Sequence, residues 1–303
     1  MRIVFMGTPD FAVPSLEILV KSGYDVVAVI TAPDKPAGRG LKLTESAVKQ
    51  FATANGLRIL QPVKLKDTQF LDELKALKPD LQIVVAFRML PEVIWSMPRM
   101  GTINLHGSLL PDYRGAAPLN WAIIKGETET GVTSFFIEKE IDTGKIIFQE
   151  KISIGLDETA GELHDRMMHI GAELILKTVH AIENGDAPAI KQPQNSSVKL
   201  APKLTREGCQ INWSQSSIEV FNFIRGLSPY PGAWTLLDGK VFKIYRAAKF
   251  FKTPEAPPGT FIFSDKDLKI TTPDGYILPK EVQMEGKKKM DIGEFLRGAR
   301  SSL

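Results

Sequence analysis

The feature that most constrains the fold is an alternation of short apolar runs with longer amphipathic segments over the first two thirds of the chain. Asp25–Thr31 and Leu81–Phe87 are rich in β-branched residues and almost continuously apolar, which is typical of parallel strands buried on both faces. Thr44–Asn55 and Asp67–Leu77 have the patterns of helices. This alternation predicts an α/β domain with a parallel, doubly wound sheet.

The last third of the chain has a different pattern. It predicts one helix at Ser216–Arg225, followed by short strands separated by turn dipeptides such as Asp238-Gly239, as in a small β-barrel. A length of 303 residues fits two domains of roughly 100–200 residues each. Because the polar, proline-containing stretch before residue 204 has no apolar period, we expect a first domain, a linker and a second domain at 1–187, 188–203 and 204–303.

The net charge of +3 conceals an uneven distribution. Residues 203–303 contain 16 Lys and Arg against 11 Asp and Glu, whereas the first 202 residues contain 22 against 24. The last third is therefore basic and the rest slightly acidic. A basic surface of this kind can bind nucleic acid or can simply be solvated, and the charge by itself leaves both readings open.

Several classes of protein are excluded by what the sequence lacks. A single cysteine, Cys209, excludes an internal disulfide framework and a four-cysteine zinc site. No apolar run approaches the roughly 18–20 residues of a membrane span. The opening apolar run meets Gly7, Thr8 and Pro9 too early for a signal peptide. We expect a cytoplasmic monomer with neither a membrane partner nor a metal.

The common nucleotide and hydrolase motifs are also missing. The sequence contains no G-x-x-x-x-G-K-[ST] and no G-x-S-x-G, and the first strand is followed by Gly7 alone rather than by G-x-G-x-x-G. Asp142-Thr143-Gly144 is the triplet of an aspartic protease. That chemistry requires two aspartates that share a proton, and the chain holds one such triplet.

The strongest local constellation is Asn104-Leu105-His106, at the end of the strand expected at Gly101–His106. Residues two apart on a strand face the same side, so Asn104 and His106 are predicted to point together into a crevice at the carboxyl end of the sheet. An amide that donates to an oxyanion, beside an imidazole that moves protons near neutral pH, suits acyl transfer. Asp142 is a candidate to orient the imidazole. The alternative is that both side chains only satisfy groups of the following loop.

Longer motifs around these residues resemble the 10-formyltetrahydrofolate-dependent formyltransferases. They are Asn104–Pro118 (NLHGSLLPDYRGAAP), Glu129–Thr133 (ETGVT) and Asp142–Gly144 (DTG). Two N-terminal motifs narrow the resemblance to the members that formylate methionyl-tRNA: Phe5–Ala12 (FMGTPDFA) and Pro33–Gly40 (PDKPAGRG). The match is dense over residues 1–145 and weaker in the C-terminal third.

The resemblance implies a Rossmann-like formyltransferase domain with a mostly parallel sheet, then an OB-like β-barrel that helps to hold tRNA. It implies that 10-formyltetrahydrofolate is the co-substrate and initiator methionyl-tRNA the acceptor. The family's catalytic Asn, His and Asp fall on Asn104, His106 and Asp142. We expect Asn104 and protonated His106 to stabilise the oxyanion, His106 to protonate the leaving nitrogen, and Asp142 to support the imidazolium.

Two further sets of residues follow from the resemblance. The folate-binding residues are expected in two loops, one of which departs from the family pattern, because Ala86–Pro91 is about one residue shorter and has Arg88 where a small residue is common. The folate set is Phe87, Arg88, Met89, Leu90, Ser108, Leu109, Leu110 and Pro111. The tRNA set is Lys35, Arg39 and Lys42 in a flexible glycine-rich loop at 32–43, with Lys240, Lys243 and Arg246 in the second domain.

Two other functions share parts of this pattern. A sugar-nucleotide N-formyltransferase would have the Asn-x-His and Ser-Leu-Leu-Pro features without needing the basic loop or the basic barrel. An RNA-binding protein with an inactive Rossmann-like domain would have no use for Asn104, His106 and Asp142 together.

Overall fold

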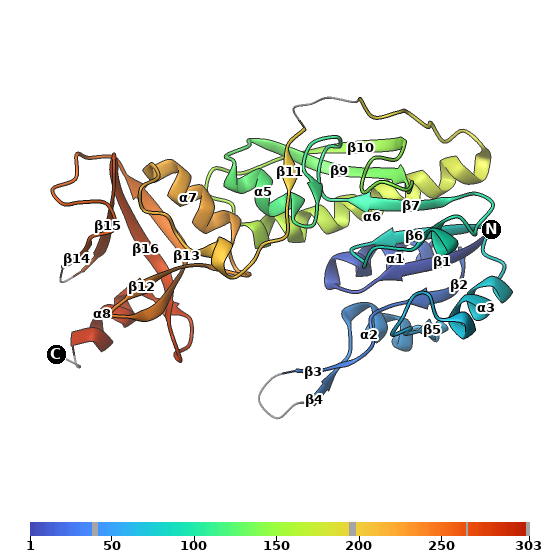
Figure 1. Ribbon diagram of the computed structural model, residues 1–303, viewed down its shortest axis with the longest axis horizontal. Coiled ribbons are helices and arrows are strands. Elements are labelled where there is room, and N and C mark those ends of the chain that lie inside the picture. Colours follow the sequence, from blue (N-terminus) through green and yellow to red (C-terminus); the bar gives the residue numbers. More distant parts are fainter. Residues whose placement is uncertain (38–41, 194–197, 265, 301–303) are drawn as a thin grey trace. The chain divides into compact units, whose positions relative to one another are not determined.

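The computed structural model describes residues 1–37, 42–193, 198–264 and 266–300, and the chain forms two compact units (Figure 1). The first unit comprises Met1–Gly115, Gly131–Ile152 and His164–Leu200. The second comprises Ala116–Thr130, Ser153–Leu163 and Ala201–Leu303. Each unit therefore contains segments that are distant in sequence. The linker at 188–203 stays a prediction.

The first unit is built on a sheet that has seven strands in the described part of the chain. In spatial order they are β10 (Ile146–Ser153), β9 (Glu129–Phe136), β7 (Thr102–His106), β6 (Leu81–Val85), β1 (Arg2–Gly7), β2 (Asp25–Ile30) and β5 (Ile59–Leu60). The strands from β7 to β5 run parallel, and β9 is antiparallel to β7. The predicted doubly wound, mostly parallel sheet is confirmed.

Helices cover both faces of this sheet (Figure 1). They are α1 (Val13–Lys21), α2 (Ala47–Ala54), α3 (Thr68–Ala76), α4 (Glu92–Trp95) and α6 (Ala160–Asn184), with a short 3₁₀ turn, η1 (Asp10–Ala12). On one face, Met6 and Val84 pack with Phe70 of α3 and Ile94 of α4. On the other, Leu105 of β7 lies against α6, where a Cβ on Gly171 would come within 2.7 Å of its side chain.

The stretch at 32–43, expected to be a flexible loop, contains two short strands. β3 (Lys35–Ala37) and β4 (Lys42–Thr44) pair antiparallel, with Lys35 opposite Thr44. Thr44 therefore belongs to a strand, and α2 begins later than expected, with the Ser46 side chain accepting a hydrogen bond from the main-chain N–H of Lys49. The alternating pattern of these residues is too short and too rich in Gly and Pro to be recognised as a hairpin from sequence.

The second unit contains an antiparallel sheet in the order β12-β13-β16-β15-β14, with β17 paired to β16. Its strands are β12 (Ala233–Leu237), β13 (Lys240–Phe250), β14 (Phe261–Phe263), β15 (Leu268–Thr272), β16 (Gly275–Met284) and β17 (Met290–Asp291). The sheet curls around a core that includes Phe242, Ile244 and Ile277, which confirms a small barrel-like domain.

Helices contribute buried side chains to the core of this second unit. The described helical elements of the unit are α5 (Pro118–Ile124), η2 (Glu207–Cys209), α7 (Ser217–Gly226) and α8 (Ile292–Arg300); two further short strands of the chain are β8 (Arg114–Gly115) and β11 (Leu200–Ala201). The predicted helix α7 starts with a reciprocal capping box between Ser216 and Glu219. The sequence did not predict α8, although Phe295 and Leu296 are buried in the core. Among the helices of the described ranges, none combines the length and apolarity needed to span a bilayer.

Candidate active site

Asn104 and His106 lie at the carboxyl end of β7, on the same side of the strand. Asn104 is in register with Val84 of the parallel neighbour β6, and His106 with Thr133 of antiparallel β9. Leu105 between them faces α6. The predicted alternation along the strand is therefore present, and it brings an amide and an imidazole to the edge where α/β folds place their sites.

The imidazole of His106 is buried and lies between two oxygen atoms. Its Nε2 is 2.9 Å from the main-chain oxygen of Tyr113. Because a carbonyl oxygen can only accept, Nε2 carries a proton in this arrangement. Nδ1 lies 3.8 Å from Oδ2 of Asp142, which is longer than a hydrogen bond and within the distance of an ion pair when the imidazole carries a second proton. Nδ1 is thus the nitrogen available to gain or lose a proton.

Asp142 is held in a turn that leaves its carboxylate directed at this imidazole. Oδ2 accepts a hydrogen bond of 2.9 Å from the main-chain N–H of Gly115. The backbone of Asp142 is left-handed, with φ of 55°, a conformation that Asp and Asn adopt more readily than other non-glycine residues. At Gly144 a Cβ would fall 1.7 Å from the main-chain oxygen of Phe136, so only glycine fits there. The D-T-G triplet is thereby explained as a tight turn.

The side chain of Asn104 is partly exposed. Within the described ranges, the structure gives its amide no hydrogen-bond partner. Asn104 lies on the same side of the strand as His106. Its amide can therefore donate a hydrogen bond to an oxygen of a bound molecule. The alternative that Asn104 satisfies loop groups therefore has no contact to support it among these residues.

The loop at 108–111 is stabilised by hydrogen bonds to Asp112 and to Thr133 of β9. The buried Ser108 hydroxyl donates to the main-chain oxygen of Asp112 at 2.6 Å, and Thr133 Oγ1 donates to the Ser108 carbonyl at 2.6 Å. Leu110 is buried with Phe135 and Ile146. Ser108 and Leu110 therefore shape the loop, while Leu109 and Pro111 are partly exposed.

The second predicted folate loop follows β6. Leu90 is buried and Phe87 packs against the same core, whereas the Met89 side chain is 73% exposed. The Arg88 guanidinium donates to the main-chain oxygens of Pro62 and Val63, the latter at 2.9 Å. Partial burial lowers the pKa of Arg88. The unusual arginine of this sequence thus connects two loops of the protein.

The predicted basic residues of the first unit lie in the β3–β4 hairpin. Lys35 is exposed on β3, Lys42 lies on β4, and Arg39 lies outside the described residues. The base of the hairpin is tethered by Asp34, which contacts Lys49 Nζ at 2.5 Å and accepts from Gln61 Nε2 at 2.8 Å. These hydrogen bonds lower the pKa of Asp34, and the same contact raises the pKa of Lys49.

The three basic candidates of the second unit lie on β13 in different environments. Lys240 is exposed, whereas Lys243 Nζ donates to the main-chain oxygen of Pro231 at 2.9 Å. Arg246 forms an ion pair with Glu162. Hydrogen bonds from the Thr159 main chain and from Arg246 lower the pKa of Glu162 to about 2.

Two contributors to the site were not predicted from sequence. The Tyr113 carbonyl binds His106, and its residue lies within the Asn104–Pro118 motif that already pointed to this loop. The Gln192 side chain donates to the main-chain oxygens of Asp142 and Gly144. Gln192 stands in the segment expected to be a linker, and no pattern in the sequence singles it out.

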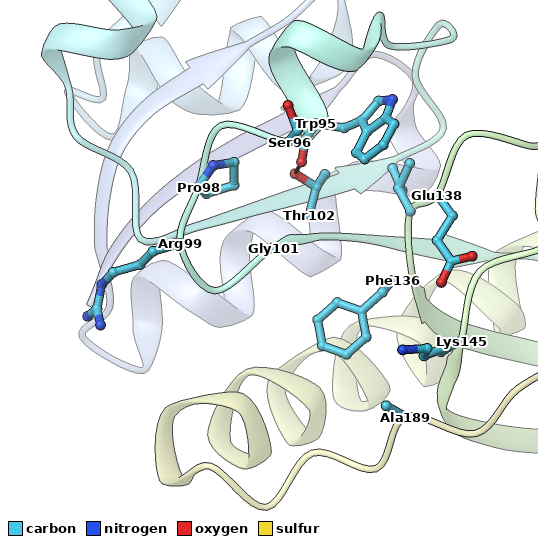
Figure 2. A pocket seen from close by; sticks show the side chains of 11 residues that line it. Trp95, Ser96, Pro98, Arg99, Gly101, Thr102, Phe136, Glu138, Lys145 and Ala189 are labelled. Carbon is cyan, nitrogen blue, oxygen red and sulfur yellow. Dashed lines mark hydrogen bonds between the residues drawn. The ribbon is translucent and has the colours of Figure 1, made fainter.

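A shallow hollow of about 350 Å³ lies at the opposite end of β7. Figure 2 shows its lining side chains, among them Trp95, Arg99, Thr102, Phe136 and Lys145. It contains none of the predicted site residues. Among the described residues, no group of three or more His, Cys, Asp or Glu side chains is placed to hold a metal ion.

Comparison with known proteins identifies the family of the chain. A family model described as formyl transferase matches residues 1–179, and one described as the formyl transferase C-terminal domain matches 203–300. The curated methionyl-tRNA formyltransferase of Flavobacterium johnsoniae is 53% identical over 302 residues, which cover 98% of this chain and 96% of the relative. The chain belongs to the methionyl-tRNA formyltransferase family.

A second curated relative belongs to the same family, and a solved structure shares the fold of this formyltransferase. The methionyl-tRNA formyltransferase of Bacteroides fragilis is 50% identical over 307 residues, covering 98% of this chain and 95% of the relative. An N-formyltransferase from Helicobacter canadensis, solved with folinic acid and dTDP-3-aminofucose, superposes with a TM-score of 0.69 at 24% identity. That alignment covers 93% of this formyltransferase and 98% of the other chain, and it establishes a shared fold.

Proposed function

We propose that this protein transfers a formyl group from 10-formyltetrahydrofolate to the α-amine of methionine on initiator tRNA. The observation that carries the proposal is the placement of His106 between the Tyr113 carbonyl and the Asp142 carboxylate, with the Asn104 amide on the same side of β7. Within this family, that set of groups is suited to acyl transfer between nitrogen atoms without a covalent enzyme intermediate.

The reaction requires stabilisation of one developing charge and the transfer of two protons. The amine attacks the formyl carbon, and the carbonyl oxygen of the formyl group becomes an oxyanion in a tetrahedral intermediate. We assign Asn104 and protonated His106 to this oxyanion, because preorganised donors act there without further rearrangement. When the bond to N10 breaks, His106 supplies the proton that N10 takes up.

Asp142 has two roles in the proposal. Its carboxylate, 3.8 Å from Nδ1, orients the imidazole and faces its positive charge when the ring acts as an imidazolium, and it takes the proton of the attacking amine through water. The hydrogen bond from Gly115 keeps the carboxylate in place when the imidazole is neutral. Tyr113 fixes the other ring nitrogen, so the proton needed by the reaction is exchanged at Nδ1.

The folate co-substrate is assigned to the loops at 87–90 and 108–111. Leu109, Pro111 and Met89 present partly or fully exposed side chains there, and the inward side chains of these loops hold the backbone in shape. Arg88 contributes by joining the first loop to Pro62 and Val63. Apolar surface with a few main-chain polar groups is the usual lining of a site for a flat, heteroaromatic ligand.

For the acceptor, we assign Lys35, Arg39 and Lys42 of the first unit and Lys240, Lys243 and Arg246 of the second to contacts with tRNA phosphates. Such contacts release counterions, so tRNA binding is expected to weaken steeply as salt is raised. We propose further that residues 1–187 carry the chemistry and 204–303 help to hold tRNA. The protein is proposed to act as a monomer in the cytoplasm, where charged tRNA is used.

The test is transfer of labelled formyl from 10-formyltetrahydrofolate to three acceptors: initiator methionyl-tRNA, elongator methionyl-tRNA and a dTDP-amino sugar. We expect the initiator tRNA to be formylated best and the amino sugar not at all. Asp142→Asn is the control, since Asn tolerates the left-handed backbone and can still accept from Gly115 but carries no charge. Transfer to the sugar alone, or tRNA binding with no transfer, would refute the proposal.

A further inference from the structure

The side chain of Gln192 connects the two segments that meet at Asp142. Its Nε2 donates to the main-chain oxygens of Asp142 and Gly144, each at 2.8 Å. Its Oε1 accepts from Arg114, at 3.2 Å from Nε and 2.6 Å from Nη2. Both donors and the acceptor of the amide are therefore used within one unit of the chain.

The turn that Gln192 holds contains a residue in an uncommon backbone conformation. Asp142 is a non-glycine residue in the left-handed region, a conformation that persists only where surrounding contacts impose it. Gln192 binds the main-chain oxygens on either side of Thr143 and so fixes the orientation of both peptide groups. The Asp142 side chain then points toward His106 and the Gly115 N–H.

The Oε1 atom of Gln192 fixes the segment that contains Arg114 and Gly115. Arg114 directly precedes Gly115, whose N–H binds the Asp142 carboxylate. By holding Arg114 with one atom and the Asp142 turn with another, Gln192 sets the separation between the carboxylate and the segment that carries its hydrogen-bond donor. Tyr113, whose main-chain oxygen contacts His106, is the residue directly before Arg114.

We propose that Gln192 is a positioning residue for Asp142, and through it for the proton transfers at His106. The inference rests on the function proposed above for Asp142. Because both donors and the acceptor of its amide are used within the protein, we expect removal of Gln192 to lower kcat and leave both KM values unchanged.

Two variants distinguish the hydrogen bonds that Gln192 donates from those that it accepts. Gln192→Glu keeps an acceptor for Arg114 but places a carboxylate oxygen against the carbonyls of Asp142 and Gly144. Gln192→Ala removes the contacts with Arg114 as well as those with the two carbonyls. We expect each variant to lower kcat for methionyl-tRNA by roughly 10- to 100-fold, since small displacements of a reacting group have effects of that order. The matched control is Gln50→Glu, which makes the same change at an exposed glutamine whose Nε2 also donates to a main-chain carbonyl, at 3.3 Å.

The deciding measurement is a double-mutant cycle with Asp142→Ala. If Gln192 acts through Asp142, adding Gln192→Ala to Asp142→Ala lowers kcat no further, within about twofold, because coupled residues are not additive. Losses that multiply, or wild-type kcat in Gln192→Glu, would overturn the inference while leaving the proposed function intact. Wild-type transfer by Asp142→Ala would instead refute the role of Asp142 itself, and this inference with it.

Discussion

The two ends of β7 differ in kind. At the amino end, the side chains around Thr102 line an open hollow, and the Thr102 hydroxyl is used internally, 2.7 Å from the main-chain oxygen of Trp95. At the carboxyl end, Asn104, His106 and Asp142 converge, and the last two are held by main-chain groups. We therefore infer the site from the polar groups that meet at the carboxyl edge of the parallel strands rather than from the concave surface at the amino end.

The largest difference between the two ends is expected in turnover. His106→Ala should lower kcat by roughly 10²–10⁴-fold, because it removes both the proton carrier and a cation beside the oxyanion. Asn104→Ala should lower it by roughly 10²–10³-fold through the loss of one donor. Lys145→Ala, at the hollow, serves as the control and should leave kcat unchanged. Formylation of methionyl-tRNA by each variant measures all three, and a comparable loss in Lys145→Ala would contradict the assignment of the chemistry to the carboxyl end of β7.

A smaller loss is expected from Gly144→Ala. The added methyl group would meet the main-chain oxygen of Phe136, which belongs to the sheet and cannot move aside easily. The turn must then shift and carry Asp142 with it, so kcat should fall by roughly 10- to 100-fold. Thermal unfolding should also occur at a lower temperature, since overpacking costs about 1–3 kcal/mol. Unchanged kcat with an unchanged melting temperature would show that the close approach is absent.

At the amino end, Thr102→Val should affect stability and not activity. The substitution leaves the Trp95 carbonyl without the Thr102 hydroxyl and removes its contact with Gln82 Oε1 at 3.1 Å. Loss of a buried hydrogen bond of this kind costs about 1–3 kcal/mol. Urea unfolding should detect the change, while kcat for formyl transfer stays at the wild-type value. A fall in kcat without a fall in stability would place Thr102 in the reaction and contradict the contrast.

The smallest expected effect is a pH dependence at the amino edge of β6. Hydrogen bonds from the Arg2 main chain and from the Arg99 side chain lower the pKa of Asp80 below its ordinary value of 3.8. A lowered carboxylate pKa stabilises the fold above pH 3.8, and this contribution disappears as pH falls below that value. Asp80→Asn should therefore be less stable than the wild type at pH 7, by less than about 1 kcal/mol. The gap should narrow at pH 3 in urea titrations, and a gap that widens would contradict the assignment.

How far the sequence predicts this molecule depends on the range of the interaction. The parallel sheet and the pairing of Asn104 with His106 on one side follow from periods within single segments, and the structure agrees with both. Asp142 was one candidate carboxylate from the residues alone, and only the resemblance assigned it a catalytic role, because no local rule connects a turn at 142 with a strand ending at 106. The β3–β4 hairpin and α8 were missed because their patterns are short and lie in segments rich in glycine or charge.

The contacts of Gln192 could not be predicted from the sequence. Its contacts reach Asp142 and Arg114 across separations of 50 and 78 residues. It comes from a polar, aperiodic segment in which every neighbour looks equally unconstrained. Nothing in the pattern distinguishes a glutamine that satisfies two carbonyls and a guanidinium from one that is only solvated, since the distinction exists only after the chain has folded.

The left-handed backbone of Asp142 also has a consequence for how such a protein can change over generations. Of the residues reachable from an aspartate codon by one base change, asparagine is the one that both tolerates this conformation and can still accept from Gly115. A single transition in the first base of the codon would thus yield a chain that can keep the turn but loses the negative charge beside His106. If Asp142 has the role proposed for it, such a chain would bind charged tRNA without formylating it efficiently, whereas larger or branched residues at this position are opposed by the backbone conformation itself.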